Sequence, residues 1–475
     1  MLKHIVNSAI CSCLAVFLLS LTLLDGPEAV GQTAPQAAAP TAGSFQGSVV
    51  QGSASPEAIG LSLDDAIQRG LTANLGIILS QNQTSAARGQ RISQLQSLLP
   101  SVDFAAKETV SQVDLPAEGF RFPGFPTVIG PFGYTDVRAS LSWSVVDLSA
   151  LRNYLAARHN FAAAQLSAQD ARDLVVLTVG NAYLLVLADE TNVESVKAQV
   201  ATSQVSLNQA IANHDAGTSP RLDELRARVD YQQQEQYLIS AQTALEKDKL
   251  ALARTIGLPL EQKFTLTDKA PYAALDQVDA NALIAQAQAN RKDLAALVEQ
   301  AAAAAEQRKA ATDERLPTLK ANADYGDIGT TLSHSHGTVD ANGTVSFPVF
   351  KEFGLRGDAE QAQAQLDTAN AQLSDRKAQV DADVRDALLD IEAAQKQVEV
   401  ARSSVDLANQ ALSDAQQQYA NGVSDNLAVS QAQQSVAQAN AQYVASLYRH
   451  NVAKLTLARA LGAGESYKNY VKQAQ

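Results

Sequence analysis

The sequence predicts a mainly α-helical fold with a membrane β-barrel contribution, in which two tandem repeats each hold long coiled-coil helices and a β-hairpin. A duplication is the first observation behind this prediction: Gly217 and Gly422 lie 205 residues apart, and so do two Leu-Ala-Arg segments at 252–254 and 457–459. The second is a heptad pattern that runs down to Gly422, and the third is a change to a two-residue period midway through each repeat. Because the spacing between the landmarks is the same in both copies, we expect structurally equivalent halves.

The chain begins with a predicted secretory signal peptide at residues 1–31. Lys3 supplies a positive charge, residues 9–24 are apolar, and the small residues 29–31 offer a cleavage site. We therefore expect an exported protein. Residues 32–60 are rich in Gln, Ala, Gly, Ser and Pro, and they predict a flexible leader because they hold few bulky apolar side chains.

Composition argues against several classes of function. The 475 residues carry a formal net charge of −13, so nucleic acid, which requires concentrated Lys and Arg, is not expected as a partner. Both cysteines, Cys11 and Cys13, lie in the signal, so the exported chain has no disulfide and no thiolate metal site. Lipidation of Cys13 is disfavoured, because the apolar run follows this residue when it should precede it. After the signal we find no apolar stretch of about 18 residues, so no transmembrane helix is expected and any membrane span must be β.

Each repeat is predicted to hold one long helix and two shorter ones. Residues 148–216 contain one Gly and no Pro and would form a helix of about 100 Å at 1.5 Å per residue. The return helix at 218–256 reaches only about 60 Å, so an earlier helix near 62–97 is expected to stack end to end with it along the long partner. Repeat 1 as a whole is predicted at 61–258 and repeat 2 at 279–462, with a linker at 259–278 between them and a C-terminal tail at 463–475. The helices predicted in repeat 2 span 280–313, 353–421 and 423–461.

The helix that ends before Gly422 carries the most regular pattern. Its apolar residues follow one another at alternating steps of three and four, which is typical of a coiled coil. Bulky residues alternate with Ala, so a neighbouring helix is expected to approach closely. The first repeat has a weaker version at Val186, Val193, Val200 and Leu207. The pattern of the second repeat consists of Ile391, Ala394, Val398, Ala401, Val405, Ala408, Leu412, Ala415 and Tyr419.

Between the helices each repeat changes to alternation of apolar and polar residues, which predicts a β-hairpin. The strands are expected at about 101–112 and 134–147 in repeat 1 and at about 318–328 and 338–350 in repeat 2. For a single strand, a soluble sheet with one buried face would be the simpler interpretation. Here the helices are too long to cover the strands, and the apolar stripe of 137–145 would project to about 21 Å when tilted, close to the apolar band of a bilayer. We therefore predict a lipid-facing stripe of Val137, Ala139, Leu141, Trp143 and Val145.

The number of strands bears on the oligomeric state. Four strands cannot close a barrel, and an open edge in lipid leaves backbone groups unpaired at several kcal/mol each. The chain must therefore oligomerise to span the membrane. Two copies would give eight strands, whose bore is nearly filled by side chains, whereas three copies give twelve and leave room for water and solute. A conducting channel favours a homotrimer.

Several short motifs recur in order in both halves. They are Leu99-Pro100-Ser101 and Leu316-Pro317-Thr318 before the first strand of each hairpin, Gly217 and Tyr419-x-x-Gly422 at the turns, and the two Leu-Ala-Arg endings. With these motifs the chain resembles the TolC-like outer-membrane efflux proteins, or outer-membrane factors, over residues 60–462. The resemblance implies a trimer whose twelve-stranded outer-membrane barrel continues into a long periplasmic α-helical barrel. It also implies a passive exit duct of a tripartite efflux or type I secretion system, joined through a periplasmic adaptor (membrane fusion) protein to an inner-membrane pump.

The resemblance further implies a periplasmic gate. Members of the family close the helical tip with side-chain links between neighbouring hairpins, and the matching positions in this sequence are Asp223 and Tyr419. A basic partner is expected two positions past Gly422, where this chain has Ser424. Asp425 is the third predicted gate residue: it would partly substitute for the family's acidic ring, whose matching positions here are Ala428 and Gln431, and Asp at a helix start also has an ordinary role as a cap.

The helical tips carry two further expectations. The positions that match the family's acidic ring are Ala428 and Gln431, neither of which is acidic, so a strong cation-binding constriction is not expected.

A helix that reverses within about two residues requires a positive φ, which glycine supplies. We therefore predict that the adaptor docks on the tip residues Gly217, Thr218 and Ser219 and on Gly422, Val423 and Ser424.

No catalytic residue, cofactor or metal site is predicted, so the protein is not expected to be an enzyme. His334 and His336 would share one face of a strand, yet a metal needs further ligands that the sequence does not place nearby. There is no nucleotide-binding loop, so the energy for transport must come from a partner. Two alternatives stay open: a periplasmic adaptor or coiled-coil spacer, which shares the heptads but needs one helical hairpin, and a diffusion porin, which needs many more strands per chain.

Overall fold

The computed structural model describes residues 41–121, 123–268, 272–274, 279–421, 423–424 and 426–468. The predicted signal and the first part of the predicted leader, up to residue 40, lie outside the described residues. Repeat 1 consists of α2 (Leu63–Ala73), α3 (Leu75–Gln96), β2 (Ser101–Asp114), β3 (Val128–Val146), α4 (Leu148–Asp215) and α5 (Arg221–Ile256). Repeat 2 consists of α6 (Ala280–Asn290), α7 (Lys292–Asp313), β5 (Thr318–Gly329), β6 (Ser335–Ser346), α8 (Glu352–Ala420) and α9 (Asn426–Ala460). The short elements are η1 (Ala42–Gln46), β1 (Ile59–Leu61), β4 (Phe264–Leu266), η2 (Leu332–His334) and η3 (Gly464–Ser466).

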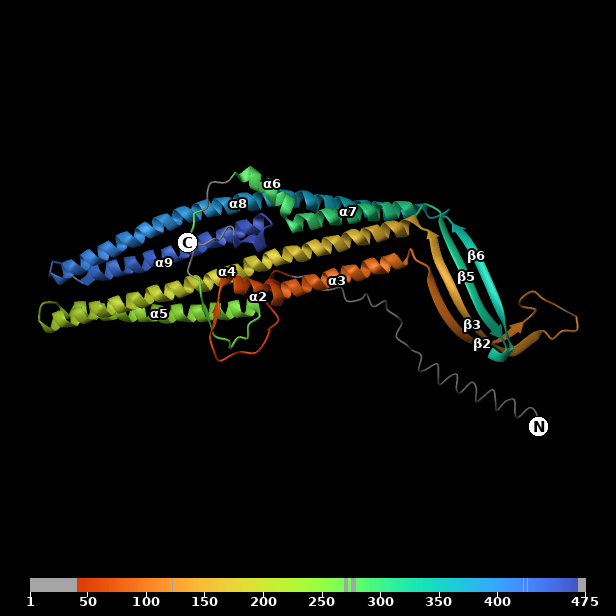
Figure 1. Ribbon diagram of the computed structural model, residues 1–475, viewed down its shortest axis with the longest axis horizontal. Helices are drawn as coiled ribbons and strands as arrows, with labels where there is room; N and C mark the ends of the chain where they lie inside the picture. The colour runs from red at the N-terminus through yellow and green to blue at the C-terminus, as the bar shows by residue number, and fades with distance from the viewer. Residues whose placement is uncertain are drawn as a thin grey trace, which may run out of the picture. The chain divides into compact units, whose positions relative to one another are not determined.

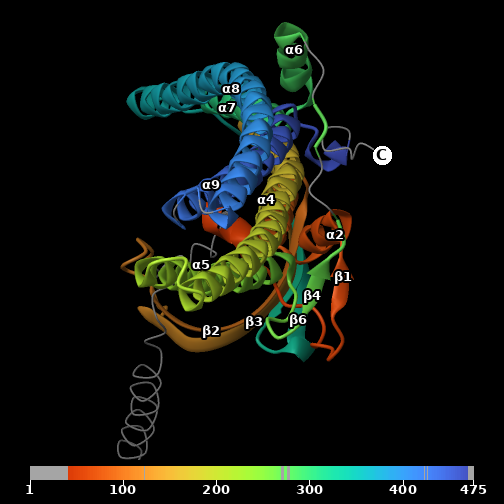
Figure 2. The same ribbon diagram turned by 90° about the vertical axis from the view of Figure 1, so that its left-hand side faces the viewer.

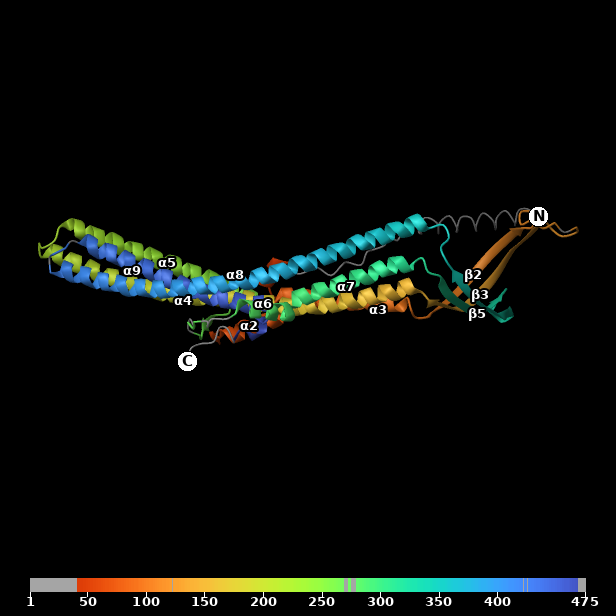
Figure 3. The ribbon, with the colours of Figure 1, turned by 90° about the horizontal axis from the view of Figure 1, so that it is seen from above.

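Each long helix lies beside shorter helices of its own repeat. Figures 1 and 3 show α4 running along α3, α2 and α5, and α8 running along α7, α6 and α9. In addition, α4 packs against α7 and α9 of the other repeat. Figure 2 looks toward the helical turns and shows the α4–α5 and α8–α9 hairpins as neighbours. Helix α4 therefore joins the helices of the two repeats, and the pairing of β3 with β5 joins their strands.

The short helices differ from the sequence prediction, because each predicted single helix is broken in two. Asn74 is extended, with φ −66° and ψ 132°, and it separates α2 from α3. Its side chain is fully buried and accepts from the backbone N–H of Gly76 at 2.9 Å while donating to the carbonyl of Phe45 at 2.7 Å. Arg291 makes the equivalent break between α6 and α7, and its guanidinium binds Asp293 at 2.7 Å and Asp383 at 2.5 Å. Neither residue type stops a helix by itself, so these breaks depend on tertiary partners.

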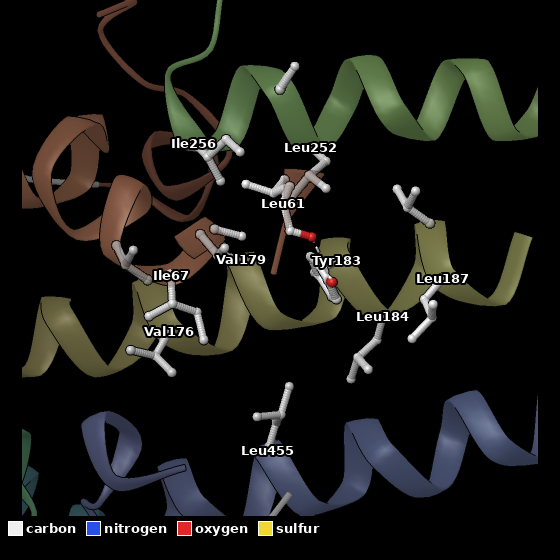
Figure 4. Packing of buried hydrophobic residues seen from close by; sticks show 14 of the residues in the cluster. Leu61, Ile67, Val176, Val179, Tyr183, Leu184, Leu187, Leu252, Ile256 and Leu455 are labelled. Atoms are coloured by element: carbon white, nitrogen blue, oxygen red, sulfur yellow. Dashed lines mark hydrogen bonds between the residues drawn. The ribbon is translucent and has the colours of Figure 1, made fainter. Parts of the chain in front are cut away.

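The main hydrophobic core surrounds the middle of α4. Figure 4 shows Val179 and Tyr183 pointing toward Leu252 of α5, while Leu184 points toward Leu455 of α9. The Tyr183 hydroxyl donates within this core to the carboxylate of Asp268 at 2.9 Å, so its polar end is satisfied. A second cluster joins α6, α8 and α9; its buried members include Leu283, Ile284, Val380, Val384, Ile391, Leu457 and Leu461.

Helix α4 contains one 18-residue stretch that is long and apolar enough to cross a membrane, although the sequence analysis expected none. More than half of that stretch, 56%, is buried inside the structure. A helix that is apolar on nearly all sides is also typical of a buried core position. Its burial against α2, α5 and α9 accounts for its composition.

The described leader residues are ordered, which differs from the flexible leader predicted up to residue 60. The backbone N–H of Val49 donates to the carbonyl of Ala73 at 2.9 Å, and that of Leu75 donates to the carbonyl of Gly47 at 3.0 Å. Strand β1 then pairs in parallel with β4. These hydrogen bonds hold the described leader residues against the junction of α2 and α3, although the leader has few bulky apolar side chains of its own.

The duplication is visible in the core. Several pairs of positions that lie 205 residues apart are buried in both repeats, and they include Val175 and Val380, Val179 and Val384, Val186 and Ile391, and Val193 and Val398. The return helices also end alike, at Gly257 with φ 75° and Gly462 with φ 65°. A Cβ added at Gly257 would lie 2.6 Å from the Cβ of Ala73, and one at Gly462 would lie 2.9 Å from the backbone of Arg291. Each return helix therefore ends against the break between the two short helices of its own repeat.

Candidate functional site

Strands β2, β3, β5 and β6 form one antiparallel sheet in that order. Phe104 lies opposite Ala139, Ala139 opposite Tyr325, and Tyr325 opposite Val339, so this row shares one face. Phe104, Tyr325 and Val339 are 74%, 64% and 77% exposed. The sheet therefore has an apolar face that the described part of the chain leaves uncovered, and a patch of this kind marks a membrane or protein contact.

Four residues of the stripe predicted to face lipid lie on this apolar face: Val137, Ala139, Leu141 and Trp143. Val145 does not follow the alternation. The register shifts between Ser144 and Val146, so Val146 and not Val145 lies opposite Leu319. A bulge of this kind changes the face of the sheet to which the following side chains point. The prediction assumed uninterrupted alternation along the strand and so did not include the bulge.

The opposite face of the sheet is polar. Arg138 donates to Asp136 at 2.9 Å on its own strand and to Asp324 at 2.7 Å on β5. The amide of Asn322 donates to that of Asn342 at 3.3 Å across β5 and β6. The same face carries Asp103, Lys107, Lys320, Asp340 and Thr344. One sheet thus presents lipid-compatible groups on one side and water-compatible groups on the other.

Both outer strands of the sheet have a free edge. Within the described residues, β2 pairs only with β3, and β6 pairs only with β5. The outward backbone N–H and C=O groups of these two strands have no strand partner in the described part of the chain. In lipid such groups would carry a large free-energy cost, so the edges call for a further strand on each side.

The tip between α4 and α5 holds three of the predicted docking residues. Gly217 has φ 71°, and a Cβ at this position would meet no atom within 4 Å. The backbone N–H of Gly217 donates to the carbonyl of His214 at 2.9 Å, and that of Thr218 donates to the carbonyl of Asn213 at 2.9 Å. Thr218 is exposed and Ser219 is half-buried. This turn is a tight reversal that presents an open, polar surface.

The tip between α8 and α9 is described in part. Gly422 and Asp425, a predicted docking residue and a predicted gate residue, lie outside the described residues. Val423 is 77% exposed, and its backbone N–H donates to the carbonyl of Gln418 at 2.9 Å. Ser424 is half-buried. The described part of this tip therefore includes an exposed apolar residue next to the turn.

The two predicted gate residues within the described part of the chain are both buried near the tips. Asp223 is 6% exposed, with the guanidinium of Arg226 at 3.8 Å, and its backbone carbonyl accepts from the Asn426 side chain at 3.5 Å. Tyr419 is 8% exposed, and its hydroxyl has no hydrogen-bond partner among the described residues. The structure thus brings Asp223 to the first turn of α9. It gives no bond between Asp223 and Tyr419 in the described chain.

One acidic residue near the tips was missed by the sequence analysis. Asp230 accepts a hydrogen bond from the hydroxyl of Ser430, next to Gln431, one of the positions that match the family's acidic ring. One turn farther along, Gln433 donates to Ser206 at 2.8 Å. Asp230 lies seven residues after Asp223, which is the heptad spacing that places two side chains on the same side of α5. That spacing is the signal by which the sequence could have indicated it.

The histidines of the β5–β6 turn form no metal centre within the described chain. His334 Nδ1 lies 3.1 Å from the hydroxyl of Ser333 and 3.2 Å from that of Thr331. No group of three or more His, Cys, Asp or Glu residues that could hold a metal ion occurs among the described residues.

The family model described as outer membrane efflux protein matches residues 67–258 and 283–463. A search of curated proteins gives no match.

Several solved structures have a similar fold. The outer membrane protein VceC from Vibrio cholerae is 21% identical with a TM-score of 0.75, over 84% of this chain and 96% of that one. The CmeC outer membrane channel of Campylobacter jejuni is 17% identical with a TM-score of 0.76, over 86% and 89% of the two chains. The open state of the MtrE outer membrane channel of Neisseria gonorrhoeae is 17% identical with a TM-score of 0.73, over 93% and 98%.

Proposed function

The chain belongs to the outer membrane efflux protein family, and from this membership we propose that three copies form the passive exit duct of a tripartite export system. The membership confirms the TolC-like resemblance: the protein is an outer-membrane efflux channel and not an enzyme. In the proposal, an inner-membrane pump loads the duct through a periplasmic adaptor protein, for efflux or for type I secretion. The alternatives left open by the sequence, a periplasmic adaptor or coiled-coil spacer and a diffusion porin, do not belong to this family.

The four-stranded sheet is the observation that supports a trimer. Its two free edges belong to β2 and β6, and one copy encloses no lumen. Pairing β6 of one copy with β2 of the next removes every free edge once the ring closes. Three copies supply twelve strands, which leaves a water-filled bore, whereas eight strands would be filled by side chains.

The two faces of the sheet set its orientation in the proposed barrel. The exposed apolar row through Phe104, Tyr325 and Val339 faces lipid, because charged or hydrogen-bonding groups there would be costly to desolvate. Arg138 and its two carboxylate partners face the lumen. The helices that follow the strands then extend the duct on the periplasmic side, and the tips lie at the far end.

The gate is proposed at the tips. Asp223 and Tyr419 are buried there, and the hydroxyl of Tyr419, which has no partner among the described residues, is available to bind a group supplied when the tips close. Asp425, which lies outside the described residues, is the third proposed gate residue. Asp230 adds a carboxylate one heptad along α5, beside Ser430 and close to Gln431, so acidic character at this level comes from α5 and not from α9.

The adaptor is proposed to dock on the tips. Gly217, Thr218 and Ser219 form one site, and Gly422, Val423 and Ser424 form the other. A side chain at Gly217 would project into open space, so this surface is free to receive a partner. The exposed Val423 supplies an apolar contact.

Leucine at the tip glycines tests the docking proposal. We expect Gly422→Leu and Gly217→Leu to abolish export in a strain that depends on this channel, while the amount of trimer in the outer membrane stays unchanged. Gly119→Leu is the matched control, because Gly119 also has a positive φ, 86°, and open space around its Cβ, but lies in the loop between β2 and β3. Full efflux in both tip variants would contradict the docking sites.

The trimer itself is tested by lysine cross-linking of the outer-membrane fraction and by conductance in planar bilayers. We expect a ladder that ends at three copies and an ion-conducting pore. A species that stays monomeric after cross-linking would contradict the proposed duct.

A further inference from the structure

The packing of α9 provides a template for a contact that a single chain cannot complete. Helix α9 lies between two long helices, α8 of its own repeat and α4 of the other. Helix α5, its counterpart 205 residues earlier, packs chiefly against α4 of its own repeat. If the two hairpins are equivalent, α5 should also lie beside a second long helix.

Two contacts define the seam between α9 and α4. Arg459 Nη2 donates to Asp170 Oδ1 at 2.6 Å, and both side chains are largely buried, at 12% and 15% exposed. One turn earlier on α9, Leu455 is 2% exposed and shares a hydrophobic cluster with Leu184 of α4. Figure 4 shows Leu184 pointing toward the helix that carries Leu455. An ion pair and a leucine contact thus stand next to each other in this seam.

The residues at the equivalent positions of the other repeat, 205 residues away, have the same side-chain types. They lie on α5 and α8, which do not contact each other in this way within one chain. The counterpart of Arg459 is Arg254 on α5, and the counterpart of Asp170 is Asp375 on α8. Both side chains are exposed, and neither has an ion pair within the described residues. The counterpart of Leu455 is Leu250, and that of Leu184 is Leu389. These two leucines are 49% and 63% exposed, although their equivalents are buried.

We propose that α5 of one copy packs against α8 of the next copy, with Arg254 paired to Asp375 of the neighbouring copy and Leu250 packed against Leu389 of that copy. This inference rests on the proposed oligomeric duct and assigns the residues that hold its helical part together. The occupant of the exposed surface on α8 is a second copy of this chain, because the chain already contains the same seam in internal form. Repetition of the seam around the ring covers α5 and α8 in every copy.

The proposed contact between α5 and α8 of neighbouring copies differs from the contact between α9 and α4 at one position. Gly180 lies opposite Leu455, where an added Cβ would come within 2.6 Å of Leu455 Cδ1. Its counterpart on α8 is Arg385, whose guanidinium binds Asp381 on the same helix at 2.6 Å. The helices between copies therefore approach less closely than α4 and α9, and Leu250 also rests on the aliphatic part of Arg385. The long side chain of Arg254 is suited to bridging this wider gap.

A charge exchange tests the ion pair on the full-length protein in outer-membrane extracts. We expect Arg254→Asp and Asp375→Arg each to lower the fraction of detergent-resistant trimer by at least threefold, because each places like charges opposite one another. The double variant R254D/D375R should regain most of the trimer. Equal losses in the double variant and the single variants would overturn the pairing.

Cysteine cross-linking tests which copies make the contact. A short bis-maleimide should join Arg254→Cys to Asp375→Cys between chains and give covalent trimers, whereas neither single variant should react in this way. Asp170→Cys with Arg459→Cys is the matched control, since the equivalent positions lie in one chain and the linked product should migrate as a monomer. Failure of the 254–375 link in protein that lysine reagents still trap as a trimer would overturn this inference and leave the proposed duct standing. Absence of any trimer would instead contradict the duct.

Discussion

The indole Nε1 of Trp143 donates to the backbone carbonyl of Leu98 at 3.1 Å. Trp143 lies on the apolar face of β3, and Leu98 lies in the turn that follows α3. The bond joins the sheet to the helices of the same repeat. A tryptophan with an apolar ring toward lipid and a satisfied N–H toward protein is typical of a membrane interface.

Trp143→Phe should weaken this connection. Phenylalanine keeps an apolar ring and loses the hydrogen-bond donor, so we expect a loss of about 1 kcal/mol in the free energy of unfolding. The measurement is the temperature at which the detergent-extracted protein unfolds, followed by circular dichroism. Tyr325→Phe serves as control, because Tyr325 is on the same face and its hydroxyl makes no hydrogen bond within the described residues. An equal shift in both variants would show that the indole bond is not the cause.

The glycines with positive φ should respond differently to alanine. At Gly217 only the backbone conformation opposes a side chain, and we expect Gly217→Ala to cost about 1 kcal/mol. At Gly462 the added Cβ would also press on the backbone of Arg291 at 2.9 Å, so Gly462→Ala should cost several times more. Thermal unfolding of the two variants side by side checks the order. Equal losses would mean that the contact with Arg291 relaxes without cost.

The buried His450 should make the protein sensitive to acid. Its ring lies 5.2 Å from that of Tyr272, and neither ring nitrogen has a hydrogen-bond partner among the described residues. Burial and then the charge of Lys454 lower the pKa of His450 from 6.5 to about 4. Between these two values the unfolded chain binds a proton that the folded chain does not, so stability falls as the pH drops from 6.5 to 4. The loss is on the order of 3 kcal/mol.

His450→Phe tests this dependence. The variant keeps a ring against Tyr272 and removes both unpartnered nitrogens, so we expect a gain of about 1 to 3 kcal/mol at neutral pH and a smaller loss of stability toward pH 4. Urea unfolding in detergent at pH 7 and pH 4.5 measures both effects. The control His334→Gln replaces an exposed histidine that lies outside the core, and it shows what the loss of a histidine as such does in the same assay. A persistent acid loss in H450F would mean that another group titrates.

Tyr419→Phe tests the proposed gate. The hydroxyl is buried and has no partner in the described chain, so its removal should not reduce stability. If this hydroxyl holds the tips closed, the resting conductance in planar bilayers should rise. Tyr231→Phe is the control, because its hydroxyl donates at 2.7 Å to Glu235 on the surface of α5. A resting conductance equal to that of the wild type would remove Tyr419 from the gate.

Some details of the fold could not be predicted from the sequence. Strand β6 ends at Ser346, although the alternation of Val345, Phe347 and Val349 suggested a strand to about residue 350. Pro348 interrupts that stretch and lacks a backbone donor, which disfavours a strand interior. The bulge before Val146 depends likewise on the neighbouring β5, because pairing between two strands is not encoded in the period of one.

The sequence by itself determined the duplication and the alternation of helical and strand periods, because each is a regularity of the chain that needs no packing partner. The export signal at residues 1–31 stays a prediction from the sequence. Only the tertiary structure decided the breaks at Asn74 and Arg291, the burial of Asp223, and the contrast between buried Leu455 and exposed Leu250. Two residues with the same place in a repeat have the same local preferences. Their burial differs because one faces a helix of its own chain and the other faces a surface that a single copy leaves open.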